Sequence, residues 1–534
     1  KSVRDRVLTS QALHSCNMKN TKCGNRCSCM PKNTKKCFTV LTISGALLVV
    51  FGTVCFIKGD GWIQSIIDSK LVIKPNSPIY RQWISPTVPV RMQFFVFNVE
   101  NPLEMKQGEQ PYVIQKGPYC YRVHQLRKNI TWNDNSTVSF NKFTKYIFSA
   151  ECSCSSCDAS KDTITLPNVP LVILSEVSKM YPGSALIFNI IFESFKEEFF
   201  KEITVHEMLW GYRDPVFQLF SELRRKFHLS FLPDIDPIFR MMYNNTLDGV
   251  TTVHTGALDI SKAGGWTMWK GKPDVGLWNS SWANMFNGSD GMQFPPQIRK
   301  DDTLYAFYVQ LCRSMRFVYD SQFNVHGVNT MRFTYPAELW QNASVNPANK
   351  GFCPNGCFPT GILDASVCKN TPIAVPAIVA SEPHFYQGDP ALVNGVGGLR
   401  PNKEEHGTFF DVEPHFGLPL HLSLRLQLNV NIKPTKYIFQ MANVKEVILP
   451  LIYFNNSVTV DSSTVHTVKT VLIPMKLVPW VSAGFVCIGS IELLCVISWV
   501  IFIRSKRKKQ QPAEKEQSKT INDDENQPLL GNGK

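Results

Sequence analysis

An apolar run near the C-terminus constrains this chain more than any other feature. Residues 480–503 carry one charged side chain, Glu492, and five Lys/Arg follow within residues 504–509. Because an α-helix rises about 1.5 Å per residue, about 20 apolar residues cross a bilayer core of about 30 Å. Basic clusters flank membrane spans on the cytosolic side. We therefore expect a transmembrane helix at residues 477–503 and a cytosolic tail at residues 504–534.

A second apolar run, residues 38–57, carries no charged side chain and follows Lys35 and Lys36. A signal peptide is the alternative, but the leader is long and the run exceeds the usual 7–15 residues. We expect a retained transmembrane helix here, with residues 1–37 as a cytosolic tail. Residues 58–476 would then form one lumenal or extracellular ectodomain, and both termini would be cytosolic.

The positions of glycosylation signals and cysteines agree with this topology. Every N-x-S/T sequon lies between the two runs, as expected of a domain that matures in the secretory pathway. The sequon asparagines are Asn129, Asn135, Asn244, Asn279, Asn287, Asn342 and Asn455. The same segment holds an even number of cysteines, which predicts disulfides in an oxidising compartment. These are Cys120, Cys152, Cys154, Cys157, Cys312, Cys353, Cys357 and Cys368.

Sequence alone leaves about 105 pairings for eight cysteines. The close spacing of Cys152, Cys154 and Cys157 could also suit a metal cluster, but an oxidising compartment favours disulfides. Cys120 completes an even set with these three, so we expect two bridges among the four and no metal site.

Charge and motifs exclude several function classes. Much of the net charge of +13 lies beside the apolar runs, where it suits a membrane surface, so we expect no nucleic-acid partner. His206-Glu207 lacks the second histidine of a zinc-peptidase helix, and there is no G-x-S-x-G elbow or phosphate-binding loop. We predict no catalytic residues, no enzyme activity and no cofactor. Glu492 would need a partner within the membrane, either on a neighbouring helix, as in a homo-oligomer, or by local hydrogen bonding.

Two segments predict long strands. Residues 92–99 are rich in β-favouring side chains and end before Asn101-Pro102. From Leu420 to Ile432 apolar and polar residues alternate, which places the apolar set on one face of a strand. A strand of this length needs a broad sheet or a barrel. Its apolar face lines either an ordinary core or the wall of an apolar cavity.

Residues 184–223 show helical spacing instead. One expected apolar face comprises Ile187, Ile190, Ile191, Phe195 and Phe199. Phe188, Phe192 and Phe200 widen the apolar sector, so the helix is either sandwiched or leaves an apolar patch for a partner. Asp214-Pro215 should interrupt it and start a second helix with proline in the first turn.

The C-terminal tail carries an address. Glu525 followed by Leu529-Leu530 resembles an acidic dileucine signal, which cytosolic adaptor complexes read. This motif predicts a lysosomal or late-endosomal membrane protein, with cycling through the plasma membrane.

Several separate motifs, in one order, resemble the scavenger receptor class B family over roughly residues 38–503. They are GPYCYR (117–122), LWGYRDP (209–215), NGSDG (287–291), LCRSM (311–315), FCPNGC (352–357), PHFYQGDP (383–390) and PNKEEHGTFFDVEP (401–414). The dileucine-ended tail is most similar to the lysosomal branch of that family.

The resemblance implies an α+β membrane glycoprotein with two transmembrane helices. Its ectodomain would be a large antiparallel β-barrel enclosing a lipid cavity, capped by an apical helical bundle near residues 172–230. It also implies the bridges Cys312–Cys368 and Cys353–Cys357. The expected lipid is cholesterol, a fatty acid or a phospholipid.

The resemblance further implies that the apex binds a lumenal protein or a lipoprotein. The ligand-binding residues would be Phe192, Phe195, Lys196, Phe199 and His206. Lys196 matches a ligand-binding lysine of the family, while its partner position holds Ser194. Since a histidine titrates near pH 6.5, His206 is either a pH sensor or an ordinary surface histidine.

These observations favour a lysosomal or endosomal receptor that binds a protein ligand, such as a lysosomal hydrolase, and conducts lipid or sterol. The alternatives are a cell-surface receptor for lipoproteins or fatty acids, and an adhesion glycoprotein without transport.

Overall fold

A computed structural model describes residues 32–86, 88–181, 183–228, 234–369 and 377–523. The chain divides into two compact units. The first contains residues 1–61 and 473–534, and the second contains residues 62–472.

The first unit is built from two long helices, α1 (Lys32–Leu71) and α11 (Ser462–Asp523), of which it holds the parts before residue 62 and after residue 472. Lys36–Leu71 and Ser462–Lys506 are long and apolar enough to cross a membrane, and each contains an 18-residue stretch with a mean hydropathy of 2.5. Both therefore extend beyond the apolar runs seen in the sequence.

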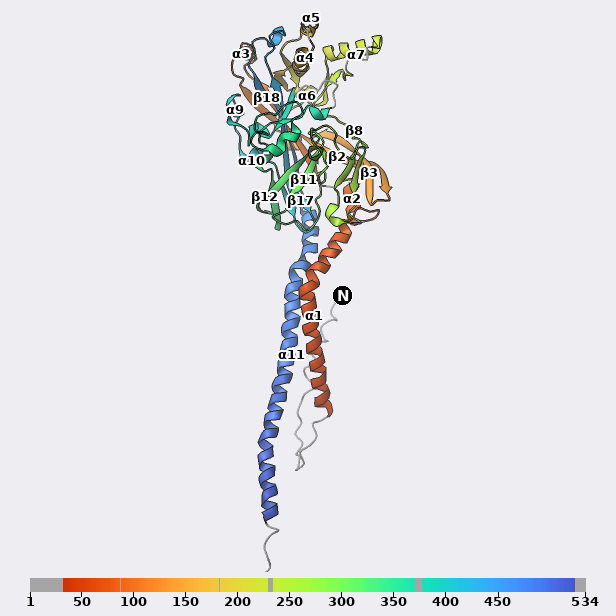
Figure 1. The fold of residues 1–534 in the computed structure, drawn as a ribbon, viewed down its shortest axis with the longest axis vertical. Coiled ribbons are helices and arrows are strands. Elements are labelled where there is room, and N and C mark those ends of the chain that lie inside the picture. The colour runs from red at the N-terminus through yellow and green to blue at the C-terminus, as the bar shows by residue number, and fades with distance from the viewer. Residues whose placement is uncertain (1–31, 87, 182, 229–233, 370–376, 524–534) are drawn as a thin grey trace, which may run out of the picture. The chain divides into compact units, whose positions relative to one another are not determined.

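Within the first unit the two helices lie side by side (Figure 1). The rings of Phe38 and Trp499 stack with centroids 3.8 Å apart. A Cβ atom at Gly489 would lie 2.6 Å from the carbonyl oxygen of Gly45, so only glycine permits this approach. Small residues at a helix contact allow the backbones to pack closely, which is how membrane helices commonly associate.

The second unit is organised by one 14-stranded sheet whose main path is β10-β9-β3-β2-β1-β18-β17-β16-β13-β12-β11. Neighbouring strands on this path pair antiparallel, as between β1 and β18 and between β17 and β18. The strands are β1 (Val90–Val99), β2 (Val113–Asn133), β3 (Thr137–Phe148), β8 (Thr246–Leu247), β9 (Thr251–His254), β10 (Trp266–Trp269), β11 (Leu304–Tyr308), β12 (Arg313–Val325), β13 (Val328–Thr334), β14 (Leu363–Asp364), β15 (Ile378–Ser381), β16 (Phe409–Glu413), β17 (Leu418–Ile432) and β18 (Val447–Thr459).

A short segment closes the sheet between its two edge strands. The Trp266 amide of β10 donates to the Gly288 carbonyl at 2.9 Å, and the Phe307 amide of β11 donates to the Ser289 carbonyl at 2.8 Å. Gly288 has φ +76°, and a Cβ atom there would lie 1.8 Å from the backbone carbonyl oxygen of Tyr305. The NGSDG motif therefore joins the edges, and the expected large antiparallel β-barrel is confirmed.

Both expected strands are present, as parts of β1 and β17. The polar face of β17 is not solvated, however. Gln427 and Asn429 are fully buried, and both side-chain amides donate to the Ser381 hydroxyl on β15. Strand β15 pairs with this part of β17, so polar residues that alternate with leucines are satisfied by hydrogen bonds inside the protein.

The helices of the second unit are short. They are α2 (Pro78–Ile84), α3 (Pro102–Lys106), α4 (Val169–Met180), α5 (Ser184–Phe195), α6 (Val205–Trp210), α7 (Pro215–Phe227), α8 (Ser281–Asn284), α9 (Pro390–Asn394) and α10 (Lys403–His406). Short 3₁₀ helices cover Ala150–Cys152, Ile260–Lys262, Ala337–Leu339, Pro347–Phe352, Val367–Lys369, Pro383–Phe385 and Phe439–Met441. Two small ribbons pair β4 (Thr163–Pro167) with β5 (Phe200–Thr204) and β6 (Tyr212–Arg213) with β7 (Ile238–Phe239).

The helix expected to start at residue 184 is shorter than the sequence pattern suggested. It ends at Phe195, because Lys196 adopts a left-handed conformation with φ 54°. The chain then turns, so that Phe199 is fully buried and its carbonyl accepts a hydrogen bond from the Asn168 amide at 2.8 Å. Burial of Phe199 and the β4–β5 pairing therefore outweigh the helical spacing. The second helix begins as expected, with Asp214 as its N-cap before Pro215.

Candidate functional site

Helices α4, α5 and α7 gather at one end of the second unit (Figure 1). Residues 62–71 and 462–472, which belong to the same unit, lie at its other end. We call the first of these the apical end.

The apical end presents large apolar side chains to solvent. Leu186, Ile187 and Ile190 on α5 are 66%, 58% and 59% exposed. Asn189, on the buried side of α5, donates from Nδ2 to the Tyr437 carbonyl at 2.7 Å and accepts from the Phe439 amide at 3.2 Å. Tyr437 and Phe439 are themselves 76% and 69% exposed. These exposed side chains, named here the apical apolar surface, are Leu186, Ile187, Ile190, Tyr437 and Phe439.

The residues expected to bind a ligand at the apex have different positions in the structure. Phe192 and Phe199 are fully buried, so they support the surface from below. Phe195 is 41% exposed, and Lys196 is exposed at the end of α5. The face of α5 that packs on the core is the one with Phe188 and Phe192, while Ile187 and Ile190 face outward. The sequence could not distinguish these faces because both are apolar.

His206 does not belong to α5. It lies on the short helix α6, which follows strand β5. The exposed His206 side chain lines a cavity of about 550 Å³, together with Tyr121, Phe148 and Trp210 among others. The Tyr121 and Trp210 rings meet edge to face at 5.1 Å, and burial raises the pKa of Tyr121. This volume is in the range of small-molecule sites.

A second cavity, of about 90 Å³, lies within the barrel unit. Its lining is mainly apolar and includes Trp83, Phe140, Trp266, Met292, Leu418, Leu422 and Val458. Ile73 and Thr464 also line it, so the cavity includes residues close to the two points where the chain enters and leaves the second unit. Leu422 thus lines this cavity, and it also belongs to the hydrophobic core together with Leu426 and Val430 of the same strand.

One ion pair lies among the mainly apolar side chains of this cavity. Arg127 is 7% exposed, and its Nη2 lies 2.7 Å from Oδ2 of Asp290. Arg127 also donates to the Trp83 carbonyl. Burial lowers the pKa of Arg127, and the Asp290 carboxylate opposes that shift. A polar group in an apolar cavity can orient an amphipathic ligand.

Four disulfides brace the second unit. The structure pairs Cys312 with Cys368 and Cys353 with Cys357. Within the set whose connectivity was open, it pairs Cys120 with Cys152 and Cys154 with Cys157.

The sequon asparagines differ in exposure. Asn129, Asn135 and Asn279 are exposed, while Asn244, Asn287, Asn342 and Asn455 are half-buried. The sorting-signal residues Glu525, Leu529 and Leu530 lie outside the described residues, as does the N-terminal tail up to residue 31. Among the residues that the structure describes, no group of three or more His, Cys, Asp or Glu side chains could hold a metal ion.

Sequence reasoning missed a buried polar cluster formed by two of the motifs. The His384 and His406 rings stack with centroids 4.3 Å apart, and burial lowers their pKa values to about 3 and about 4. Nearby Glu382 is fully buried, and desolvation raises its pKa to about 8. At neutral pH all three side chains are therefore largely uncharged. The histidines in the motifs PHFYQGDP and PNKEEHGTFF were the sequence feature that could have indicated this cluster.

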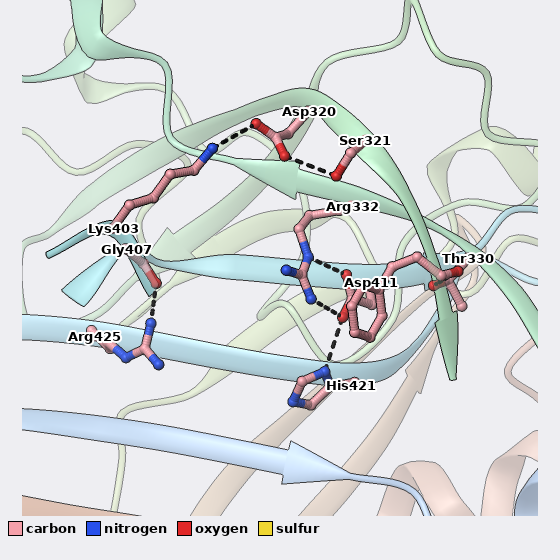
Figure 2. A network of polar contacts seen from close by, with 10 residues as sticks. Asp320, Ser321, Thr330, Arg332, Lys403, Gly407, Asp411, His421 and Arg425 are labelled. Atoms are coloured by element: carbon pink, nitrogen blue, oxygen red, sulfur yellow. Dashed lines mark hydrogen bonds and ion pairs between the residues drawn. The ribbon is translucent and has the colours of Figure 1, made fainter. Parts of the chain in front are cut away.

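A second polar network joins β13, β16 and β17 (Figure 2). Arg332 forms a bidentate ion pair with Asp411, with both N···O distances at 2.7 Å, and Nδ1 of His421 lies 2.9 Å from Asp411. The guanidinium also lies 4.1 Å from the ring centroids of both Phe323 and Phe409. Alternating strand patterns hide such contacts, because they depend on which strands become neighbours.

Comparison with known proteins gives a consistent result. The model of the CD36 family matches residues 43–501. Scavenger receptor class B member 1 of Sus scrofa is 34% identical over 473 residues, covering 87% of this chain and 89% of that protein. Lysosome membrane protein 2 of Rattus norvegicus is 35% identical over 444 residues, covering 82% and 88%. The human lysosome membrane protein 2 is 33% identical over the same length.

Proposed function

The chain belongs to the CD36 family, and on that premise we propose that it is a membrane-anchored receptor that binds a protein ligand at its apical end and admits lipid to its barrel. Both termini would lie in the cytosol, and the second unit would face the lumen or the cell exterior. The observation that carries the proposal is the apical apolar surface.

Exposed apolar side chains concentrated on one face commonly mark a protein interaction site. On α5, three of them occupy adjacent positions that a helix presents together, and Asn189 ties a second exposed segment to the same helix. Lys196 adds a cation at the edge. A folded lumenal protein with an apolar patch and an acidic rim matches this surface.

The double substitution Ile187→Ser and Ile190→Ser tests the apical site. It should weaken ligand binding at least tenfold, because burying each side chain contributes about 1.5–3 kcal/mol. Leu258→Ser is the matched control, since Leu258 is 84% exposed in the loop between β9 and the 3₁₀ helix Ile260–Lys262. Equal losses in both variants would rule out a specific apical site.

The apolar cavity supports the lipid part of the proposal. At about 90 Å³ it is smaller than typical small-molecule sites of about 300–1,000 Å³, so passage of a lipid requires side-chain movement. Cholesterol, a fatty acid or a phospholipid would gain about 0.8 kcal/mol for each methylene buried there. Arg127 and Asp290 would hold the polar group of such a lipid.

Met292→Trp tests the cavity by filling it. Lipid recovered with the purified protein, measured by mass spectrometry, should fall, and lipid transfer to the membrane should slow. Met331→Trp is the control, because Met331 is also half-buried but does not line this cavity. Unchanged lipid content in Met292→Trp would contradict the proposal that lipid passes through this cavity. A protein that never carries lipid would favour an adhesion glycoprotein.

The proposed cellular location depends on the sorting signal in the C-terminal tail. Glu525 and Leu529-Leu530 support binding of cytosolic adaptor complexes and residence in lysosomes or late endosomes. A cell-surface receptor for lipoproteins or fatty acids is the second candidate, because the chain is about as similar to a scavenger receptor class B member 1 as it is to a lysosome membrane protein 2. Leu529→Ala with Leu530→Ala should move the protein to the cell surface. If imaging finds this variant at the same location as the wild type, the second candidate is favoured.

A further inference from the structure

A small cavity of about 30 Å³ lies between the start of β12 and the segment 341–364. Its lining includes Arg313 of the LCRSM motif and Phe352 and Cys353 of the FCPNGC motif. Neither the apical surface nor the barrel cavity involves these residues, so their side-chain chemistry is unused by the proposed function.

Arg313 brings a guanidinium into this cavity with few partners. The residue is 3% exposed, and its Cζ lies 3.5 Å from the centroid of the Phe352 ring. In the described part of the chain its side chain makes one hydrogen bond, a long one of 3.4 Å from Nη2 to Oδ1 of Asn349. Its buried Nε has no acceptor. A guanidinium carries five N–H donors, so most remain unused.

A second buried arginine, Arg127, shows which contact Arg313 lacks. Arg127 is 7% exposed, and its guanidinium lies 2.7 Å from the Asp290 carboxylate. Among the described residues no carboxylate lies within 4 Å of the Arg313 guanidinium. Burial lowers the pKa of Arg313 to about 9, which still leaves it charged at neutral and acidic pH.

Asp364 lines the same cavity but is otherwise engaged. Its Oδ1 accepts hydrogen bonds from the Ser366 amide at 2.9 Å and the Ser366 hydroxyl at 2.6 Å, and Asn355 donates to Oδ2 at 3.4 Å. These contacts hold the carboxylate in its own turn. Since a buried charge without a partner is strongly unfavourable, the Arg313 cation calls for a counter-charge from outside the chain.

We propose that this cavity binds one small monovalent anion, chloride, against the free N–H groups of Arg313. The size of the cavity supports this choice, because about 30 Å³ corresponds to one water-sized species. A phosphate ester or a lipid headgroup does not fit. The bound anion would tie segment 341–364 to β12 beside the Cys312–Cys368 and Cys353–Cys357 bridges.

Thermal unfolding of the purified full-length protein in detergent tests the proposal. Chloride or bromide is titrated against sodium gluconate at constant ionic strength, since gluconate is too large for the cavity. The melting temperature should rise and saturate in chloride and in bromide only. Identical melting temperatures in chloride and gluconate would overturn the proposal.

Arg313→Met keeps the length of the side chain and should abolish the halide effect. Arg316→Gln is the matched control, because Arg316 lies on the same strand with a side chain 40% exposed and should retain the effect. If Arg313→Met does not fold, anomalous diffraction from crystals of the wild-type protein grown in bromide tests the site instead. An anomalous peak beside Arg313 supports the site, and a cavity holding only water refutes it.

Discussion

Ser44 donates its hydroxyl to Oε2 of Glu492 at 2.7 Å, across the two helices of the first unit. The single charged residue of the C-terminal apolar run therefore has a partner on the N-terminal helix of the same chain. Gly45 and Gly489 lie next to this contact and allow the approach of the backbones. This intrachain hydrogen bond gives Glu492 a partner that does not depend on a homo-oligomer.

We expect Gly489→Val to separate the two helices, because its new Cβ would lie 2.6 Å from the Gly45 carbonyl and 2.9 Å from Leu48. Disulfide cross-linking between cysteines substituted for Phe38 and Trp499, in a background without other membrane cysteines, would then decline. Gly484→Val is the control, since a Cβ at Gly484 meets nothing within 4 Å. Loss of the cross-link in both variants would contradict this helix contact.

Asp411→Asn should destabilise the second unit by about 3–5 kcal/mol, because it removes the charge partner of the half-buried Arg332. The Asp411 side chain is fully buried, so water cannot replace it. Asp320→Asn should cost less than about 1 kcal/mol, since its partner Lys403 is 58% exposed. Urea unfolding of both variants measures the difference, and equal losses would argue against a buried ion pair.

The His384–His406 pair predicts a loss of stability in acid. The pKa of His406 is lowered to about 4, so between pH 6.5 and about 4 the unfolded chain binds a proton that the folded protein does not. From pH 7.5 to 5 this residue should cost the wild type about 2 kcal/mol.

His406→Gln removes that titration, so its stability relative to wild type should improve as the pH falls. Glu382 titrates with the opposite sign, but it does so in both proteins and cancels from the comparison. His466→Gln, at an exposed position, serves as the control. Parallel pH profiles for wild type and His406→Gln would show that His406 is not buried in a neutral form.

Removal of the Cys312–Cys368 bridge, by alanine at both positions, should destabilise the protein more than removal of Cys353–Cys357. The bridges join residues 56 and 4 positions apart, and loop-closure entropy gives about 4 and about 2 kcal/mol respectively. Denaturant midpoints of the two double variants provide the measurement. The reverse order would mean that local packing around Cys353 dominates.

Local patterns predicted much of the fold. Hydropathy indicated both apolar helices, because about 20 uncharged residues have few stable arrangements outside a bilayer. Alternation indicated β17, and Asp214-Pro215 located the start of α7, since strand alternation and helix capping depend only on neighbouring residues. The barrel itself was expected from the resemblance of motifs and is confirmed in the second unit.

The sequence by itself determined where this chain is apolar, where it can be glycosylated and which family it resembles. Only the tertiary structure decided which face of α5 is exposed, since the Phe188 side and the Ile187 side are equally apolar and burial depends on the neighbouring elements. The same holds for Glu492 and Ser44, which are separated by 448 positions. Contacts over such distances are set by packing, which no local pattern records.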